Sequence, residues 1–399
     1  MGSSETQAQY YPPPESAGGW RMAEDAHSAR KLAGLDLDKL APARAWNAGF
    51  GVPSSVVIIR HGYMVADWCE NGSEPATRFN IYSCTKSFTG TAYGIMFEDA
   101  RHGRLPGVAA VDLDSHAYAY IPEGYPLTDP RKQRVTLHHL LSMSSGIPGE
   151  SIGIFGLPTA PGVNPLDAAL GHCPFRSERV RADLWALYIR SQSAAHQVPS
   201  RSERVPGDLW VSQLAAEPGE QWDYSDPAFV HLSLALAHIM GLEMGDFMRE
   251  RVFDPLGIEA LSWDTVGIDD GHTGLHTKAI SGVHISAREL ARFGYLMACG
   301  GAWNQKQIVP PWWIELATRS SQASNPGYGL TWWTNTGGAL WDGVPHDAFS
   351  AMGYNANFCC IIPSLDLVVV RIGAGPSDPV AEVIAEPFLA AVVAAVVDA

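Results

Sequence analysis

The sequence places a serine and a lysine three residues apart, in Ser83-Cys84-Thr85-Lys86, at the start of a stretch typical of a helix. Residues i and i+3 lie on one face of a helix, so the Lys86 amine can reach the Ser83 hydroxyl. A helix N-terminus favours negative charge, which stabilises an alkoxide on Ser83 and makes Lys86 easier to deprotonate. The spacing therefore indicates a serine nucleophile with a lysine base. A capping serine beside a solvated lysine is the alternative interpretation.

A second candidate group is Tyr224-Ser225-Asp226, which follows the loop sequence Pro-Gly-Glu-Gln-Trp at 218–222. A phenol close to a cationic lysine loses its proton more easily and can act as a general base. We therefore expect Tyr224 to take part in proton transfer at Ser83. A tyrosine that only packs and hydrogen-bonds at a loop is the alternative.

The third candidate is Ala351-Met352-Gly353-Tyr354, at the end of a predicted strand near the C-terminus. Acyl transfer requires two backbone N–H groups that point at the developing oxyanion. The N–H groups of Ser83 and Tyr354 can supply them, and Gly353 permits a close approach of the backbone. We therefore predict an oxyanion hole formed by Ser83 and Tyr354.

The order of these groups resembles that of the serine β-lactamase and penicillin-binding-protein superfamily. The closest resemblance is to its class C β-lactamase-like branch, with the family VIII carboxylesterases and 6-aminohexanoate-dimer hydrolase. It extends over about residues 50–375. Three further stretches are similar to segments of the family: 135–146 (V-T-L-H-H-L-L-S-M-S-S-G), 252–258 (V-F-D-P-L-G-I) and 286–294 (S-A-R-E-L-A-R-F-G). The resemblance implies Ser83 as nucleophile, Lys86 and Tyr224 as general acid/base pair, and a covalent acyl-enzyme.

Two departures from the family pattern bear on the substrate. Asp226 replaces the Asn of the Tyr-x-Asn motif; an aspartate there can hold a proton on Lys86 and shift the base role toward Tyr224. Residues 351–353 replace Lys-Thr-Gly or His-x-Gly, whose lysine helps to bind the carboxylate of β-lactams and muropeptides. These departures favour a neutral, apolar substrate. The residues expected to contact it are Asp226, Met352, Gly353, Asn355 and Phe155, although Asn355 suits a turn equally well.

Other motifs are weaker. Ser151 lies in a G-x-S-x-G pattern at 149–153, but Pro148 precedes it and no strand leads into it, so a nucleophilic role there is disfavoured. His138, His139, His272 and His276 suggest a metal, but no H-E-x-x-H pattern exists, and adjacent histidines on a helix point to different faces. We therefore expect no metal and no cofactor.

The composition is that of a globular protein, with 399 residues, 46% of them hydrophobic and 17% charged. The formal net charge of −15 disfavours nucleic acid as a partner. The N-terminus has no pattern of a secretory signal, and the apolar stretch 388–397 is too short to span a bilayer. The six scattered cysteines fit buried thiols in a reducing compartment. We expect a cytoplasmic protein without a membrane partner.

Strand patterns occur at both ends of the chain, and helical patterns occupy the middle. We predict an α/β (α+β), β-lactamase-like fold: an antiparallel sheet flanked by helices, with an inserted, mainly helical domain. The expected boundaries are a flexible tail 1–19, an α/β domain 20–80 and 275–399, and a helical domain 81–274. Helices are expected at 23–47, 83–99 and 379–397, and strands at 54–60, 63–69, 328–334, 348–352, 357–362 and 367–372.

An internal repeat lies within the segment 150–215. Arg176–Trp185 and Arg201–Trp210 agree at eight of ten positions. Two copies are too few for a solenoid. A duplicated helical segment is one interpretation, and a cap over the site or a subunit contact, hence a homo-oligomer, is the other.

The function expected from these features is that of a serine hydrolase. It would cleave a carboxylic ester or lactone of a bulky, apolar or aromatic small molecule through a Ser-Lys-Tyr mechanism. Amide or β-lactam hydrolysis, acyl transfer, and a non-catalytic binding role are the alternatives.

Overall fold

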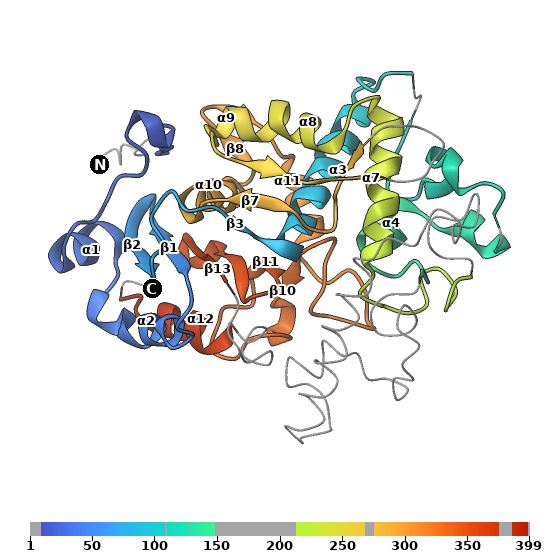
Figure 1. The fold of residues 1–399 in the computed structure, drawn as a ribbon. Helices are drawn as coiled ribbons and strands as arrows, with labels where there is room; N and C mark the ends of the chain where they lie inside the picture. Colours follow the sequence, from blue (N-terminus) through green and yellow to red (C-terminus); the bar gives the residue numbers. More distant parts are fainter. Residues whose placement is uncertain are drawn as a thin grey trace, which may run out of the picture.

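A single antiparallel sheet joins the two ends of the chain in the computed structural model (Figure 1), which describes residues 9–107, 110–127, 129–147, 213–267, 275–374 and 385–397. The strand order is β10-β11-β12-β13-β1-β2. The strands are β1 (Ser54–Arg60), β2 (Tyr63–Glu70), β10 (Trp333–Thr334), β11 (Phe349–Gly353), β12 (Asn357–Ile362) and β13 (Leu367–Gly373). The predicted sheet, built from N-terminal and C-terminal strands, is confirmed.

The hairpin β1–β2 follows directly from the local sequence. His61 and Gly62 both have left-handed backbone angles, with φ of 51° and 71°. Such a two-residue turn matches the twist of the strands that it joins. On its other side β1 pairs with β13, from Ser54 opposite Gly373 to Arg60 opposite Leu367. With neighbours on both edges and helices on both faces, every residue of β1 is buried.

Helices cover both faces of the sheet (Figure 1). Adjacent strand residues point to opposite faces. On β12, Cys359 faces α10 (Ala287–Ala298), where its Sγ lies 3.9 Å from the Leu290 carbonyl oxygen. Phe358 faces the other way and packs on Phe388 of α12, which itself packs on α2. The sheet therefore lies between α10 on one side and α2 (Ala41–Ala48) with α12 (Glu386–Ala394) on the other.

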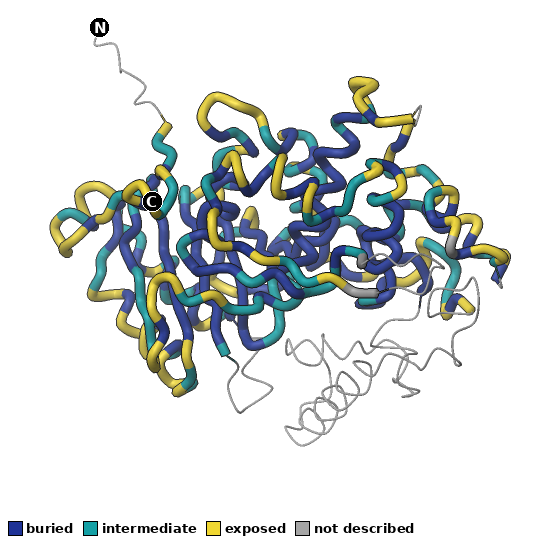
Figure 2. The backbone as a smooth tube through the Cα atoms, turned by 45° about the horizontal axis from the view of Figure 1, so that its top comes forward, coloured by how far each residue is buried: buried dark blue, intermediate teal, exposed yellow. Residues whose placement is uncertain are grey.

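The second part of the molecule is built around α3 (Thr85–Arg101), in which every residue from Thr85 to Phe97 is buried. Figure 2 shows the buried segments gathered at the centre, with exposed residues in outer loops. A Cβ atom at Gly90 would lie 1.9 Å from Thr331 Oγ1, so this glycine permits close packing. The helices α7 (Asp226–Met240) and α8 (Met244–Met248) pack on α3, and α4 (Leu137–Leu141) packs on α7. A π-helical turn, Arg249–Phe253, joins α8 to α9 (Asp254–Leu256).

Shorter elements complete the described structure. They are α1 (Ala26–Ala33), α11 (Pro311–Ala317), a small sheet β3-β7-β4 (Phe79–Asn80, Val283–Ile285, Ser262–Trp263), and the pairs β5–β6 (Thr265–Gly267, Leu275–Thr277) and β8–β9 (Ala302–Trp303, Lys306–Gln307). Among the described residues, no single helix is long and apolar enough to cross a membrane, although the bent pair Asp226–Met240 and Met244–Leu256 meets those criteria jointly.

Three predicted elements differ from the structure. The helix expected over 23–47 is interrupted: Gly34 ends α1 with φ of 56°, and the Asp36 side chain caps the following 3₁₀ turn. The strand expected over 328–334 is reduced to β10, because the chain turns at Thr331, where φ is 68°. Of the helix expected over 379–397, residues 385–397 are described and α12 is the helical part.

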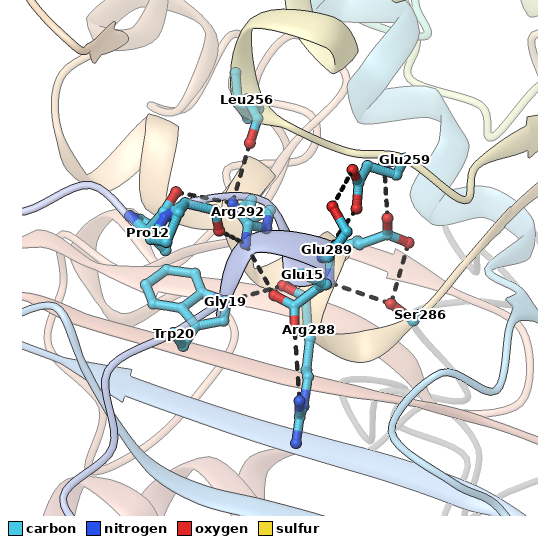
Figure 3. A network of polar contacts seen from close by, with 12 residues as sticks. Pro12, Glu15, Gly19, Trp20, Leu256, Glu259, Ser286, Arg288, Glu289 and Arg292 are labelled. Carbon is cyan, nitrogen blue, oxygen red and sulfur yellow. Dashed lines mark hydrogen bonds and ion pairs between the residues drawn. The ribbon is translucent and has the colours of Figure 1, made fainter.

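Residues 9–20 are not a free tail, as the sequence suggested, but pack against α10 (Figure 3). The Arg292 guanidinium is fully buried and donates to the carbonyl oxygens of Pro12 at 3.0 Å, Leu256 at 3.1 Å and Pro13. It also pairs with Glu15 at 2.9 Å. One cation thus satisfies carbonyl groups from two segments, which fixes the N-terminal segment. We call these residues the Arg292 clamp.

Candidate active site

Ser83 lies in a strained turn at the entrance of α3. The turn is a short 3₁₀ helix, Tyr82–Cys84, that continues directly into α3. Tyr82 has φ of 47°, which is rare for a residue with a side chain, and the Asn80 carboxamide oxygen accepts its N–H at 2.9 Å. Cys84 is buried, whereas Ser83 is half-exposed. Strain of this kind persists where the surroundings enforce it, and here it presents the hydroxyl at the N-terminus of a long helix.

Lys86 is one turn further along and points back at Ser83. Its Nζ donates to Ser83 Oγ at 2.9 Å and to the Ile280 carbonyl oxygen at 3.1 Å. The side chain is only 3% exposed. The Lys86 amine therefore reaches the Ser83 hydroxyl across the i, i+3 spacing, as predicted. The Ile280 carbonyl belongs to a loop 194 residues away, so no local pattern could have indicated it.

Tyr224 and Asp226 are positioned by the start of α7. Ser225 is the N-cap, and its side chain accepts the Ala228 N–H at 3.3 Å. Asp226 and Pro227 follow as the first helical residues, the positions at which acidic residues and proline are favoured. The cap places Tyr224 just before the helix and Asp226 on its first turn. Both residues thereby face the Lys86 side chain.

Lys86 and Asp226 form an ion pair with a Nζ–Oδ1 distance of 2.6 Å. The Asp226 side chain is 24% exposed, whereas Lys86 is nearly inaccessible. Lys86 Nζ also lies 4.8 Å from the centre of the Tyr224 ring and 5.4 Å from that of Phe229. The structure therefore brings Ser83, Lys86, Tyr224 and Asp226 together at one point.

Aromatic side chains surround Tyr224. Its ring stacks on Trp333, with centroids 6.3 Å apart and 18° between the planes, and Trp222 contacts both rings. Tyr328 packs on Trp222 and Trp333. Burial holds the pKa of Tyr328 well above its ordinary value, so its hydroxyl stays protonated. The sequence pattern predicts a strand over 328–334 and gives no signal for a role of Tyr328 at the site.

The edge of β11 approaches the Ser83 turn closely. A Cβ atom at Gly353 would lie 2.3 Å from the Ile81 carbonyl oxygen and 3.0 Å from the Ser83 nitrogen. Only glycine fits there without a shift of the backbone. The Tyr354 ring packs edge-on against Tyr82, with centroids 5.3 Å apart. The two N–H groups predicted for an oxyanion hole, those of Ser83 and Tyr354, therefore belong to segments in direct contact.

The other predicted contact residues differ in their placement. Met352 is half-buried on β11 beside Gly353. Asn355 and Ala356 have φ of 67° and 53° and form the β11–β12 turn, and Arg371 binds the Asn355 carbonyl oxygen. The structure therefore gives Asn355 the role of a turn residue. Phe155, Ser151, His272 and the repeat of 176–210 lie outside the described residues.

Of the histidines considered for a metal, two have structural partners. His139 Nδ1 accepts the Thr136 N–H at 3.2 Å and completes the capping box of α4. His276 pairs with Glu243 at 2.9 Å. Within the described part of the chain, no group of three or more His, Cys, Asp or Glu side chains is arranged to hold a metal ion.

The sequence and the fold correspond to a known family. The beta-lactamase family model matches residues 51–394, which is most of the chain. The chain belongs to the beta-lactamase family. No curated protein sequence matches it.

Solved structures share the fold at low sequence identity. A Bacillus anthracis protein assigned as a 6-aminohexanoate-dimer hydrolase is 21% identical, with a TM-score of 0.60 over 86% of this chain and 79% of its own. EstCE1, a hydrolase with promiscuous acyltransferase activity, is 16% identical, with a TM-score of 0.60 over 90% of this chain and 98% of its own. An octameric penicillin-binding protein homologue from Pyrococcus abyssi is 19% identical, with a TM-score of 0.55 over 87% and 76%. At these identities the likeness establishes the fold.

Proposed function

We propose that the chain is a serine hydrolase that cleaves a carboxylic ester or lactone of an uncharged, apolar or aromatic small molecule. The observation that carries the proposal is the contact of Lys86 Nζ with Ser83 Oγ at 2.9 Å, with the Tyr224 ring and the Asp226 carboxylate also beside the amine. A hydroxyl bound to an amine, with a phenol ring next to the amine, supplies the groups that acyl transfer requires.

The proposed reaction has two halves. Ser83 Oγ attacks the substrate carbonyl, its proton passes to the Lys86–Tyr224 pair, and the pair then protonates the leaving alcohol. Water gives a proton to the same pair and cleaves the acyl-enzyme, which restores the Ser83 hydroxyl. The N–H groups of Ser83 and Tyr354 stabilise the oxyanion in both halves.

The preference for an uncharged substrate rests on the side chains next to Ser83. Ala351 and Met352 offer no cation to a substrate carboxylate, and Lys86 is already paired with Asp226. Tyr82 and Tyr354 instead form an aromatic wall beside the nucleophile. Aromatic side chains bind flat apolar groups through large contact areas.

The test compares wild-type protein with Ser83→Ala on p-nitrophenyl esters, aromatic lactones and nitrocefin, with mass spectrometry for an acyl adduct. We expect ester or lactone turnover and an adduct on Ser83, and a loss of kcat by about 10³–10⁶-fold in the variant. Ser324→Ala, which removes an exposed hydroxyl, is the matched control. Turnover that survives in Ser83→Ala contradicts the proposal.

Acyl transfer is the second candidate, because EstCE1 combines hydrolysis with acyltransferase activity on the same fold. An added alcohol or amine acceptor would then give a transfer product at the expense of the free acid. Faster turnover of nitrocefin than of esters would favour a β-lactam instead. Self-association is also proposed, by analogy with the octameric homologue, and light scattering would measure it.

A further inference from the structure

Asn357, the first residue of β12, lies between the two segments that carry the proposed oxyanion donors. It pairs with Gly353 across β11 and β12, so it is directly opposite the residue that precedes Tyr354. The residue is only 1% exposed. A buried carboxamide requires hydrogen-bond partners for both its oxygen and its nitrogen. The partners of Asn357 therefore show which segments it holds together.

The Asn357 carboxamide joins β13 to the turn that carries Ser83. Its Oδ1 accepts the Gly373 N–H at 2.8 Å, and its Nδ2 donates to the Asn80 carbonyl oxygen at 3.1 Å. Asn80 in turn holds the turn itself, because its own carboxamide oxygen accepts the Tyr82 N–H at 2.9 Å. One side chain thus connects the large sheet to the strained turn that presents the Ser83 hydroxyl.

The backbone of Asn357 makes a second contact on the other side of Ser83. Cys84 Sγ lies 3.3 Å from the Asn357 carbonyl oxygen. Burial raises the pKa of the Cys84 thiol well above its ordinary value, so the thiol stays protonated and can donate. Asn357 therefore binds the chain both before Ser83, at Asn80, and after it, at Cys84. Two attachment points fix the position and the orientation of the Ser83 N–H between them.

The Tyr354 side of the proposed oxyanion hole is held by Arg371. This arginine is fully buried on β13, and its guanidinium donates to the carbonyl oxygen of Asn355, the residue after Tyr354. Its Nε donates to Asn47 Oδ1 on α2 at 3.1 Å. The β11–β12 turn is thus anchored on the sheet and on α2. Asn357 then links this anchored turn to the Ser83 turn.

We propose that Asn357 is a positioning residue that sets the spacing between the Ser83 and Tyr354 N–H groups. This inference rests on the proposed function and adds to it a residue that does not touch the substrate. The two N–H groups act on charge that develops only as the substrate carbonyl becomes tetrahedral. Their alignment therefore affects the transition state more than the binding of the substrate. Asn357 should control kcat and leave KM nearly unchanged.

The experiment removes the Asn357 nitrogen and measures hydrolysis and inhibition separately. Asn357→Asp keeps the shape of the side chain and the acceptor for Gly373, but it puts an oxygen against the Asn80 carbonyl. Should that variant not fold, Asn357→Ser, which removes the carboxamide without adding a charge, takes its place. A p-nitrophenyl ester gives kcat and KM per folded molecule. Phenylboronic acid, whose adduct on Ser83 would be tetrahedral, gives an inhibition constant that does not depend on hydrolysis.

Asn335→Asp is the matched control. Asn335 is also a fully buried carboxamide, whose Nδ2 donates to the Trp341 and Val344 carbonyl oxygens at 3.1 and 3.0 Å. These contacts stay within the loop that follows β10 and do not include the Ser83 turn. The control should therefore lower the free energy of unfolding, while kcat per folded molecule and the inhibition constant stay within about twofold of wild type.

For Asn357→Asp we expect kcat to fall by about 10–100-fold, the inhibition constant of phenylboronic acid to rise by a similar factor, and KM to stay within about threefold. Unchanged kcat and inhibition in a folded variant would overturn the inference. An equal fall of kcat in Asn335→Asp would also overturn it, because the effect would then be a general loosening, and so would a rise in KM alone.

Failure of the proposed function is a separate observation, namely wild-type protein without Ser83-dependent ester turnover. The comparison of phenylboronic acid binding between wild type and Asn357→Asp then decides the inference by itself. Equal binding by the two proteins, or no binding by wild type, would overturn it.

Discussion

Lys86 and Arg292 are both buried basic residues, but the groups that surround their side chains differ. Arg292 is fully buried, and its donors go to backbone carbonyls of Pro12, Pro13 and Leu256 and to Glu15. A guanidinium stays charged at any accessible pH, so the Arg292 clamp is permanent. Lys86 instead lies beside a half-exposed hydroxyl and a partly exposed carboxylate.

Burial of a basic group can therefore fix one segment on another, as in the Arg292 clamp, or place an amine beside a hydroxyl, as at Lys86. In the clamp, most N–H donors of the guanidinium are bound to protein oxygens. In the function proposed above, the groups around the Lys86 amine exchange protons. If the two regions are independent, a change in one should leave the property that depends on the other unaltered.

The largest expected effect is a loss of folding stability at low pH that arises from a buried histidine on α7. His231 on α7 lies between the Tyr118 hydroxyl at 3.0 Å and the Pro227 carbonyl oxygen at 2.7 Å. Burial lowers its pKa from 6.5 to about 4. The unfolded chain binds the proton below pH 6.5 and the folded one does not, so stability is lost as the pH falls from 6.5 to 4. The loss attributable to this residue is about 3 kcal/mol.

Denaturant unfolding at pH 7 and pH 4.5 measures this effect. His231→Gln should lose less stability between the two pH values than wild type does, whatever its stability at pH 7. An equal loss in both proteins would show that His231 is not held neutral in the folded state.

The next largest effect is expected from Gly353→Ala. The added Cβ would lie 2.3 Å from the Ile81 carbonyl oxygen, so β11 and the Ser83 turn must move apart. A misplacement of about 1 Å at reacting groups lowers kcat by about 100-fold. Ester hydrolysis by the purified variant is the measurement. Gly245→Ala on α8, where the nearest atom would be a threonine side-chain oxygen at 3.3 Å, should keep its activity and serves as the control.

The smallest effect on activity is expected in the clamp. Arg292→Met leaves the carbonyl oxygens of Pro12 and Leu256 without their donor, which should lower the free energy of unfolding by about 1–3 kcal/mol. The kcat per folded molecule should stay within about twofold of wild type, since no contact of Arg292 reaches the site. Arg30→Ala, which removes an exposed pair with Asp36, should cost less than about 1 kcal/mol. A large drop in kcat for Arg292→Met would show that the two regions are coupled.

Local patterns determined much of this protein. The Ser83–Lys86 spacing, the hairpin at His61-Gly62 and the strands β12 and β13 each depend on residues only a few positions apart. The i, i+3 spacing, the turn residues and the apolar runs that produce them can be read directly from the sequence. The family motifs added the order of the groups along the chain, and with it the predicted meeting of Ser83, Lys86 and Tyr224.

Tertiary structure alone decided the partners of those groups. The Ile280 carbonyl oxygen meets Lys86 from 194 residues away, and the aromatic contacts of Tyr224 come from a segment whose expected strand is broken at Thr331. Residues 9–20 have the composition of a tail, yet they are fixed because a single buried arginine on α10 binds their carbonyl oxygens. Such contacts form only when distant segments pack together. Each of these contacts depends on residues from two segments at once, so no pattern within either segment predicts it.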